Sequence, residues 1–209
     1  KKFGKSIIIN ENLSKYTWFN VGGPADIFFR PKNKEELLNL LNEVKNYKKK
    51  IHILGAGSNT LIRDKGVEGI VIKLSSNFSE MKIIGKDMIE VGAAALDRKV
   101  SDFATNNNIG NMEFLSCIPG SIGGAITMNS GCYGTDISQI LSSINIIDEK
   151  GLEKEIKKDE IEFFYRGTNL PKNYIIISAT LKGFLSSKDQ IKKRQEDLIK
   201  KKKFRNRAK

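Results

Sequence analysis

The chain has 209 residues, of which 39% are hydrophobic and 29% are charged, so it can form one large domain or two small ones with a buried core. Two Cys and one His exclude a disulfide scaffold, a zinc site and a His-based triad beside a metal, and we expect no metal ion. No apolar run reaches the roughly 18 residues that span a bilayer, and residues 1–12 lack the apolar core of a signal peptide. We therefore expect a cytoplasmic protein without a membrane partner.

The predicted elements of the first lobe are three strands and one helix. Residues 26–30 form a strand that ends at Pro31, and Asn33 caps a helix over residues 34–47, whose leucines recur at helical spacing. Apolar strands follow at 51–54 and 69–74.

The rest of the chain is richer in strands. We expect a hairpin over 81–84 and 88–92, a helix over 95–106, strands at 142–148, 153–156 and 174–181, and a charged helix over 188–203. This order predicts an α+β fold. We divide it into two lobes, residues 1–75 and 76–187, followed by a basic helix in residues 188–209.

The net charge of +12 at first suggests a nucleic-acid partner. Residues 188–209 contain 11 Lys or Arg and 3 Asp or Glu, so this segment alone contributes +8. The excess charge therefore lies in one terminal helix instead of a folded face, and no nucleic-acid motif accompanies it. We favour a solvated basic helix and expect no nucleic-acid partner; a phosphate- or nucleic-acid-binding module is the alternative.

A first glycine-rich loop, GAGSNT at residues 55–60, follows the strand at 51–54. Glycine lacks a Cβ, so the backbone N–H groups of such a loop can close on a phosphate, and Ser58 and Asn59 add side-chain donors. The loop is not a Walker A loop, because GK[ST] is absent, and it is not a Rossmann fingerprint, because only Gly55 and Gly57 match. Alone, the pattern fits a phosphate loop and an ordinary turn about equally well.

A second glycine-rich segment covers residues 118–134 and carries almost no charge. Such a segment is not a solvated linker, because its small side chains and its glycines allow backbone to approach a large ligand closely. Two such loops about 60 residues apart suit the diphosphate of a dinucleotide that is held from both sides.

Several strings occur in a fixed order from about residue 14 to residue 180, which is nearly the whole chain: TWFNVGGPAD (17–26), LGAGSN (54–59), EFL (113–115), IPGSIGGA (118–125), MNSG (128–131) and YRGT (165–168). Together they resemble the UDP-N-acetylenolpyruvoylglucosamine reductase family of peptidoglycan synthesis. The first string and the pair IPGSIGGA and MNSG are specific to that family. The GAGSN string is shared with other FAD enzymes of the vanillyl-alcohol-oxidase type.

The resemblance implies a two-lobed FAD-binding domain of the vanillyl-alcohol-oxidase (PCMH) type that binds FAD non-covalently. NADPH would reduce the flavin, which would pass hydride to UDP-N-acetylglucosamine enolpyruvate and give UDP-N-acetylmuramate. Another FAD-dependent oxidoreductase of the same superfamily is the alternative. We expect a monomer. The residues expected to contact FAD are Gly55, Ala56, Gly57, Ser58, Asn59, Pro119, Gly120, Ser121, Gly123, Gly124, Ala125, Thr127, Asn129 and Gly131.

Arg166 matches the arginine of the family's Tyr-Arg motif, and the resemblance makes it the catalytic residue that stabilises enolate charge. Two departures follow. Thr168 stands where the motif usually has Ser, which keeps the hydroxyl. The family's proton-donor serine and late glutamate come after the basic helix, so neither role can be given to a residue of this sequence, and we expect these 209 residues to hold flavin without completing turnover.

Four other residues have an ordinary structural interpretation. We expect His52 to be a core or strand-face histidine and not a covalent flavin link. Cys117 and Cys132 fill space beside the second loop, with a redox pair as the alternative. Trp18, the one tryptophan, is expected to pack in the core, and Tyr133 either borders the flavin or packs.

Overall fold

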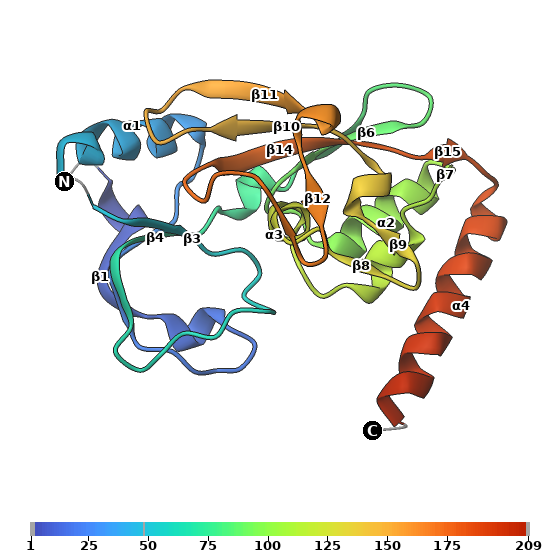
Figure 1. Cartoon of the computed structure of the whole chain (residues 1–209), viewed down its shortest axis with the longest axis horizontal. Coiled ribbons are helices and arrows are strands. Elements are labelled where there is room, and N and C mark those ends of the chain that lie inside the picture. Colours follow the sequence, from blue (N-terminus) through green and yellow to red (C-terminus); the bar gives the residue numbers. More distant parts are fainter. Residues whose placement is uncertain (1–2, 48, 208–209) are drawn as a thin grey trace.

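The structure is a computed structural model that describes residues 3–47 and 49–207. The remaining positions of the expected segments 1–75 and 188–209 lie outside the described residues. Figure 1 shows two sheets beside one another, with the N-terminal part on one side and a long C-terminal helix on the other. The mixture of helices and antiparallel and parallel strands confirms the predicted α+β class.

The first sheet has four strands in the order β1-β2-β4-β3. Strand β1 is antiparallel to β2, whereas β2, β4 and β3 are mutually parallel. The side-chain oxygen of Asn33 accepts a hydrogen bond from the Glu36 N–H at 2.8 Å and caps helix α1, as expected. The elements of this part are β1 (Ile7–Asn12), β2 (Pro24–Phe29), α1 (Lys34–Val44), β3 (Ile51–Ile53) and β4 (Val67–Ile72).

The second sheet has five antiparallel strands in the order β11-β10-β14-β6-β5, and three small strand pairs accompany it. Helices α2 and α3 pack with it in one large apolar cluster. Its strands are β5 (Met81–Ile83), β6 (Met88–Gly92), β10 (Leu141–Ile147), β11 (Glu153–Lys157) and β14 (Ile175–Lys182). The helices are α2 (Asp97–Asn106), α3 (Ile122–Thr127) and α4 (Lys188–Arg207); the small pairs are β7 (Ile109–Gly110) with β15 (Phe184–Leu185), β8 (Gly131–Cys132) with β9 (Thr135–Asp136), and β12 (Phe163–Phe164) with β13 (Gly167–Thr168).

A separate apolar cluster joins the two sheets. It combines Phe29 and the buried leucines of α1 with Ile147 of β10 and Ile175 of β14, and all of these side chains are at most 3% exposed. Burying an aliphatic side chain of this size stabilises a fold by about 1.5–3 kcal/mol. The two sheets lie on either side of residue 75, but this apolar cluster contains residues from both of them. The division into two lobes at residue 75 therefore stays a prediction.

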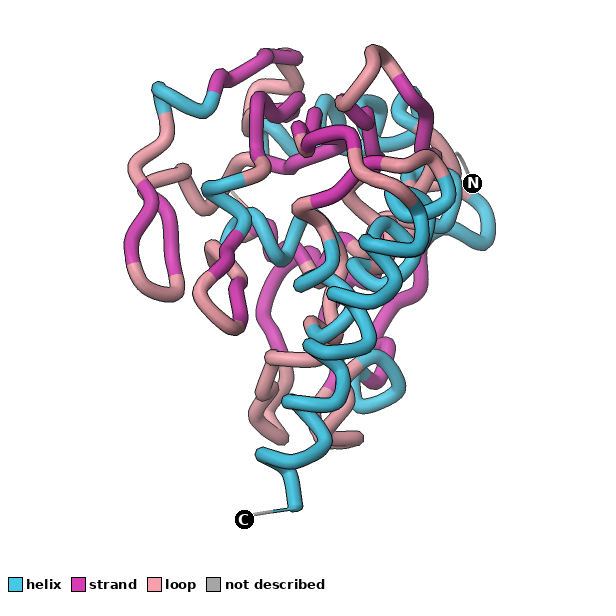
Figure 2. The backbone as a smooth tube through the Cα atoms, turned by 90° about the vertical axis from the view of Figure 1, so that its right-hand side faces the viewer, coloured by secondary structure: helices cyan, strands magenta, loops and turns pink. Residues whose placement is uncertain are grey.

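Helix α4 lies against the second sheet's helices and extends past them (Figures 1 and 2). The Arg194 guanidinium pairs with Glu113 at 2.7 Å, and the Glu113 side chain is only 7% exposed. Ile191 is buried, and the Lys202 ammonium donates to the Cys117 carbonyl at 2.9 Å. The basic helix is therefore docked along one face, while its other face is solvated. No described helix is long and apolar enough to span a membrane.

The short strands of the three small pairs were not predicted from the sequence, and neither were strand β1 and helix α3. Strand β1 was not expected, because its isoleucines are consecutive and partly exposed, so no alternation marks a strand. Helix α3 lies within the segment expected to be an open loop, although glycine is a poor helix former. The buried side chains of Ile122, Ala125 and Ile126 explain this helix, because packing overrides its weak propensity.

Asp97, at the start of α2, is fully buried, and neither of its carboxylate oxygens has a hydrogen-bond partner among the described residues. Burial raises the pKa of Asp97 from 3.8 to about 8, because the charged form loses its hydration. Between these two values the folded chain holds a proton that the unfolded chain releases. The free energy of unfolding should therefore fall as pH rises across this window, by at most about 1.4 kcal/mol per pH unit.

Asp97→Asn removes this proton, so we expect its unfolding free energy to change less with pH between 5 and 8 than that of the natural chain. Urea denaturation at several pH values measures the difference. If the unfolding free energies of the two proteins changed with pH in the same way, Asp97 would be ionised in the folded state. That result would contradict its burial in the structure.

Candidate flavin-binding site

The first glycine loop lies where three parallel strands end. Gly55 comes shortly after β3, Lys73 comes directly after β4 and Arg30 directly after β2. Ligands of parallel sheets bind outside the carboxyl ends of the strands, because loops and free backbone groups gather there. This edge of the first sheet is therefore the natural place for a site.

None of the backbone N–H groups from Gly55 to Thr60 donates a hydrogen bond within the described part of the chain. The side chains of Ser58 and Asn59 also have no hydrogen-bond partner there. The loop keeps its shape through other contacts: the Trp18 N–H donates to the Gly57 carbonyl at 3.0 Å, and Leu54 pairs with Ile72. A fixed loop with unpaired donors is suited to an anion.

The second glycine segment is attached to the second sheet by its backbone. The N–H of Gly123 donates to the Ala93 carbonyl, and the N–H of Ile122 to that of Ala95, both at 2.9 Å. A Cβ on Gly120 would lie 2.5 Å from an Asp97 carboxylate oxygen, and one on Gly131 would lie 2.5 Å from the Thr135 carbonyl. These glycines are thus required by packing, whatever binds nearby.

The two segments meet at Gly55. A Cβ added to Gly55 would lie 2.9 Å from the Ser121 hydroxyl and 4.0 Å from the Gly124 Cα. A Cβ on Gly124 would meet only the Ser121 hydroxyl, at 3.6 Å, which is ordinary contact. Gly124 is therefore the glycine of this segment that faces open space beside the first loop. Among the other predicted contacts, the Ala125 side chain is buried, so this residue can offer a ligand only its backbone.

Arg166 is held close to the second segment by a small hairpin. It lies in the turn between β12 and β13 with φ of 63°, a conformation that non-glycine residues seldom adopt. The Asn129 amide donates to the Phe164 carbonyl at 3.3 Å, and the Thr168 hydroxyl to the Thr127 carbonyl at 3.4 Å. The exposed Arg166 side chain, 5.4 Å from the Tyr165 ring, thus stands on a turn that is tied to predicted site residues.

The thiols of Cys117 and Cys132 interact with one another. Cys117 is buried and Cys132 is half-buried, and burial, with the neighbouring Cys117 thiol, raises the pKa of Cys132 to about 11. The Cys132 thiol is therefore protonated at neutral pH, and the burial of both side chains agrees with the space-filling interpretation. No group of three or more metal-ligating side chains occurs among the described residues.

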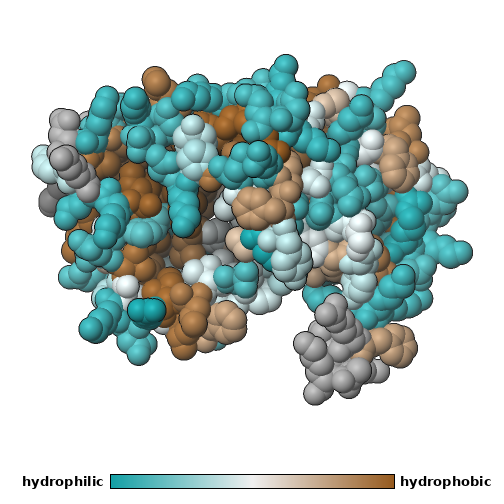
Figure 3. Space-filling view, in the orientation of Figure 1, coloured by the Kyte–Doolittle hydropathy of each residue, from teal (hydrophilic) through white to brown (hydrophobic). Residues whose placement is uncertain are grey.

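Trp18 was placed wrongly by the sequence analysis. Its side chain is 62% exposed, because the residue belongs to the turn that contacts the first glycine loop and not to a strand or helix. Other exposed apolar side chains of this lobe include Phe19, Val21 and Leu61, and Figure 3 shows apolar surface on the lower part of this lobe. His52 is exposed on β3, so it is the strand-face residue expected.

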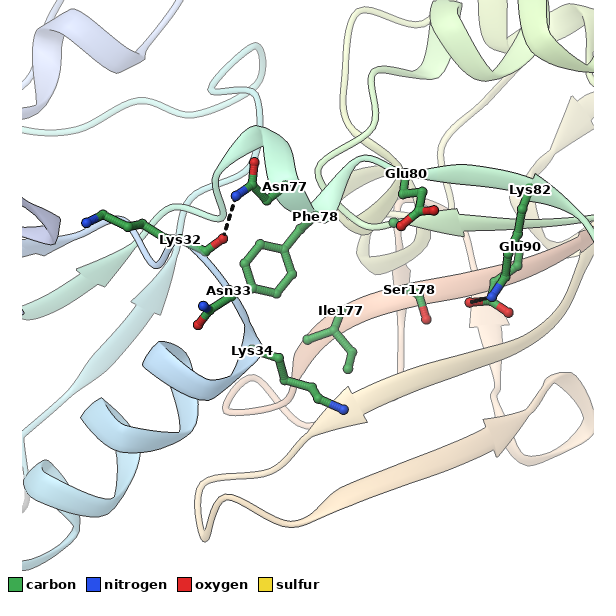
Figure 4. Close-up of a pocket in the computed structure, with 11 residues that line it drawn as sticks. Lys32, Asn33, Lys34, Asn77, Phe78, Glu80, Lys82, Glu90, Ile177 and Ser178 are labelled. Carbon is green, nitrogen blue, oxygen red and sulfur yellow. Dashed lines mark hydrogen bonds and ion pairs between the residues drawn. The ribbon is translucent and has the colours of Figure 1, made fainter.

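A cavity of about 300 Å³ lies elsewhere, between the start of α1 and strands β6 and β14 (Figure 4). Phe78 and Ile177 form its apolar wall, and Asn77 donates to the Lys32 carbonyl at its rim. None of the predicted flavin contacts lines it. The candidate site lies instead where the two glycine segments approach one another at Gly55 and Gly124.

Comparisons with known proteins agree with this geometry. A family model described as "FAD binding domain" matches residues 25–157. Alkyldihydroxyacetonephosphate synthase shares the fold with a TM-score of 0.59 at 15% identity, over 87% of this chain and 41% of that chain. The fold is therefore that of a two-lobed FAD-binding domain of the vanillyl-alcohol-oxidase type, and the predicted fold class is confirmed.

More similar proteins share the name UDP-N-acetylenolpyruvoylglucosamine reductase. The protein from Pelagibacter ubique is 44% identical over 96% of this chain and 66% of its own length, and that from Rickettsia massiliae is 46% identical over 82% and 57%. The crystal structure of the reductase (MurB) from Thermus caldophilus superposes with a TM-score of 0.81 at 28% identity, over 94% of this chain and 68% of that chain.

The chain belongs to the FAD binding domain family, and its resemblance to the UDP-N-acetylenolpyruvoylglucosamine reductases is confirmed. It spans 66% and 57% of the two curated relatives described here.

Two glycines of the site should respond differently to alanine. Gly57 has φ of 71°, and a Cβ there would lie 1.9 Å from the Tyr16 carbonyl oxygen, so Gly57→Ala should lower the free energy of unfolding by at least about 1–3 kcal/mol. Gly124 lies in α3 with room for a methyl group, so Gly124→Ala should leave this free energy unchanged or raise it by up to about 1 kcal/mol. Denaturation of the flavin-free proteins tests both; equal losses would contradict the assigned difference.

Proposed function

We propose that this chain binds FAD between residues 55–59 and residues 120–131, with the flavin diphosphate on their backbone N–H groups. The observation that carries the proposal is the first loop, in which no N–H group is paired within the described part of the chain, facing the open space at Gly124. A diphosphate would supply the missing acceptors, and charge-assisted hydrogen bonds of this kind are stronger than neutral ones.

The whole protein would reduce UDP-N-acetylglucosamine enolpyruvate to UDP-N-acetylmuramate in peptidoglycan precursor synthesis. This proposal is supported by the similarity to UDP-N-acetylenolpyruvoylglucosamine reductases and by the order of the matched strings. Bound FAD would supply the redox chemistry between NADPH and the substrate. A monomer in the cytoplasm, without membrane or nucleic-acid partners, remains part of the proposal, as does the inactivity of these 209 residues alone.

Arg166 would act on the substrate. Reduction of an enol ether that is conjugated to a carboxylate builds negative charge on the carboxylate side, and a fixed guanidinium can meet that charge with two parallel N–H donors. The turn holds the residue at a rare φ, and Asn129 and Thr127 join it to the second glycine segment. Arg166 would therefore be positioned before the substrate arrives, which is what transition-state stabilisation requires.

Gly124→Asp tests the flavin site. The carboxylate would occupy the open space beside the first loop and repel the diphosphate, so we expect the variant to fold but to lose flavin absorbance and bind FAD at least about 100-fold more weakly. Gly85→Asp, at a hairpin turn where a Cβ meets only Met88 at 3.8 Å, is the matched control. FAD binding by Gly124→Asp at the control's affinity would place the flavin elsewhere.

Arg166→Lys tests the substrate role in a full-length reductase. Lysine keeps the charge but loses the planar fork, so we expect turnover to fall by about 10²–10³. Stopped-flow measurements separate flavin reduction by NADPH, which should be nearly unchanged, from reoxidation by the enolpyruvyl substrate, which should slow. Equal slowing of both half-reactions would assign Arg166 to the general integrity of the site.

A further inference from the structure

Lys73 is a half-buried cation without a carboxylate partner among the described residues. It follows β4, the strand that lies between β2 and β3, and its ammonium donates a hydrogen bond to the Gly55 carbonyl. Burial lowers the pKa of Lys73, and the nearby positive charge of Arg30 lowers it further. Two cations thus stand together behind the first glycine loop, where burial disfavours an unpaired charge.

The peptide bond between Gly55 and Ala56 connects this contact to the free N–H groups of the loop. A trans peptide is planar, so its C=O and N–H point in opposite directions. No cis peptide occurs in the described chain, and Lys73 holds the Gly55 carbonyl, so the Ala56 N–H points away from Lys73.

Turning this peptide over would change ψ of Gly55, which has no Cβ to restrict it, and φ of Ala56, which is not positive in the structure. The carbonyl oxygen would then take the place of the Ala56 N–H and repel an anion. The hydrogen bond from Lys73 thus favours the orientation in which the start of the loop presents a donor.

We propose that Lys73 is a positioning residue of the diphosphate site: it holds the Gly55 carbonyl and so directs the Ala56 N–H at the flavin diphosphate. The inference rests on the proposed binding of FAD by this loop. It concerns the diphosphate alone, so the effect of Lys73 is confined to ligands that carry phosphate.

Titrations of the flavin-free chain with FAD and with riboflavin, which has no phosphate, test the inference. Lys73→Met keeps the aliphatic stem, and we expect it to weaken FAD binding by about 10- to 100-fold, the scale of one hydrogen bond to a charged group, while riboflavin binding changes less than about 2-fold. Lys73→Arg should restore most of the FAD affinity. Lys50→Met is the control, because Lys50 precedes β3 at the opposite edge of the sheet and forms only an exposed ion pair with Glu68.

The Ala56 amide gives a readout that does not depend on the isoalloxazine ring. Its ¹⁵N–¹H resonance should shift on addition of inorganic pyrophosphate in the natural chain and should not shift in Lys73→Met. Lys73→Gln keeps a hydrogen-bond donor without the charge, and it replaces Lys73→Met if that variant does not fold. The shift of the Ala56 resonance in Lys73→Gln should be smaller than in the natural chain and larger than in Lys73→Met.

Three results would overturn the inference. Equal weakening of FAD and riboflavin would give Lys73 a general structural role, and unchanged FAD affinity in Lys73→Met would give it none. Failure of the natural chain to bind FAD would instead refute the proposed function, and the inference with it.

Discussion

The apolar cluster shared by the two sheets is the constraint on which the site depends. Phe29, the leucines of α1 and the isoleucines of β10 and β14 form one core, so the carboxyl edge of the first sheet is held against the second. A site made of backbone segments from two lobes requires this, because an error of about 1 Å in their separation would misplace every donor. The cluster lies away from the glycine segments, so its residues can be chosen for packing alone.

The two glycine segments differ in how their backbone is held. The first is a true loop whose N–H groups are unpaired, whereas the second is pinned to β6 and its extension through Ala93 and Ala95 and contains a buried helical turn. The first segment offers hydrogen-bond donors, and the second is a fixed backbone segment with open space beside Gly124. The hairpin that carries Arg166 is hydrogen-bonded to the second glycine segment. The proposed substrate residue and the proposed flavin site are therefore held by the same segment.

Much of the fold could be predicted from the sequence, because helix α1, the hairpin β5–β6 and the strands β10 and β14 have clear periodicity or long apolar runs. Strand β1 and helix α3 could not, because neighbouring elements stabilise them against weak local patterns. Of the candidate site, the glycine strings and Arg166 were visible through family resemblance. Lys73 was not, since a lysine after a strand looks like any surface charge; its contact with Gly55 appears only when β3 and β4 lie side by side.

The exposed position of Trp18 gives the chain an internal optical reporter. This tryptophan is the only one in the sequence, it is largely exposed, and its backbone N–H donates to the Gly57 carbonyl in the first glycine loop. Its fluorescence therefore comes from one known place beside the first glycine loop, so energy transfer to a bound isoalloxazine would quench it without any label. The emission of the flavin-free chain likewise reports the solvation of this one turn, since no second indole contributes to the signal.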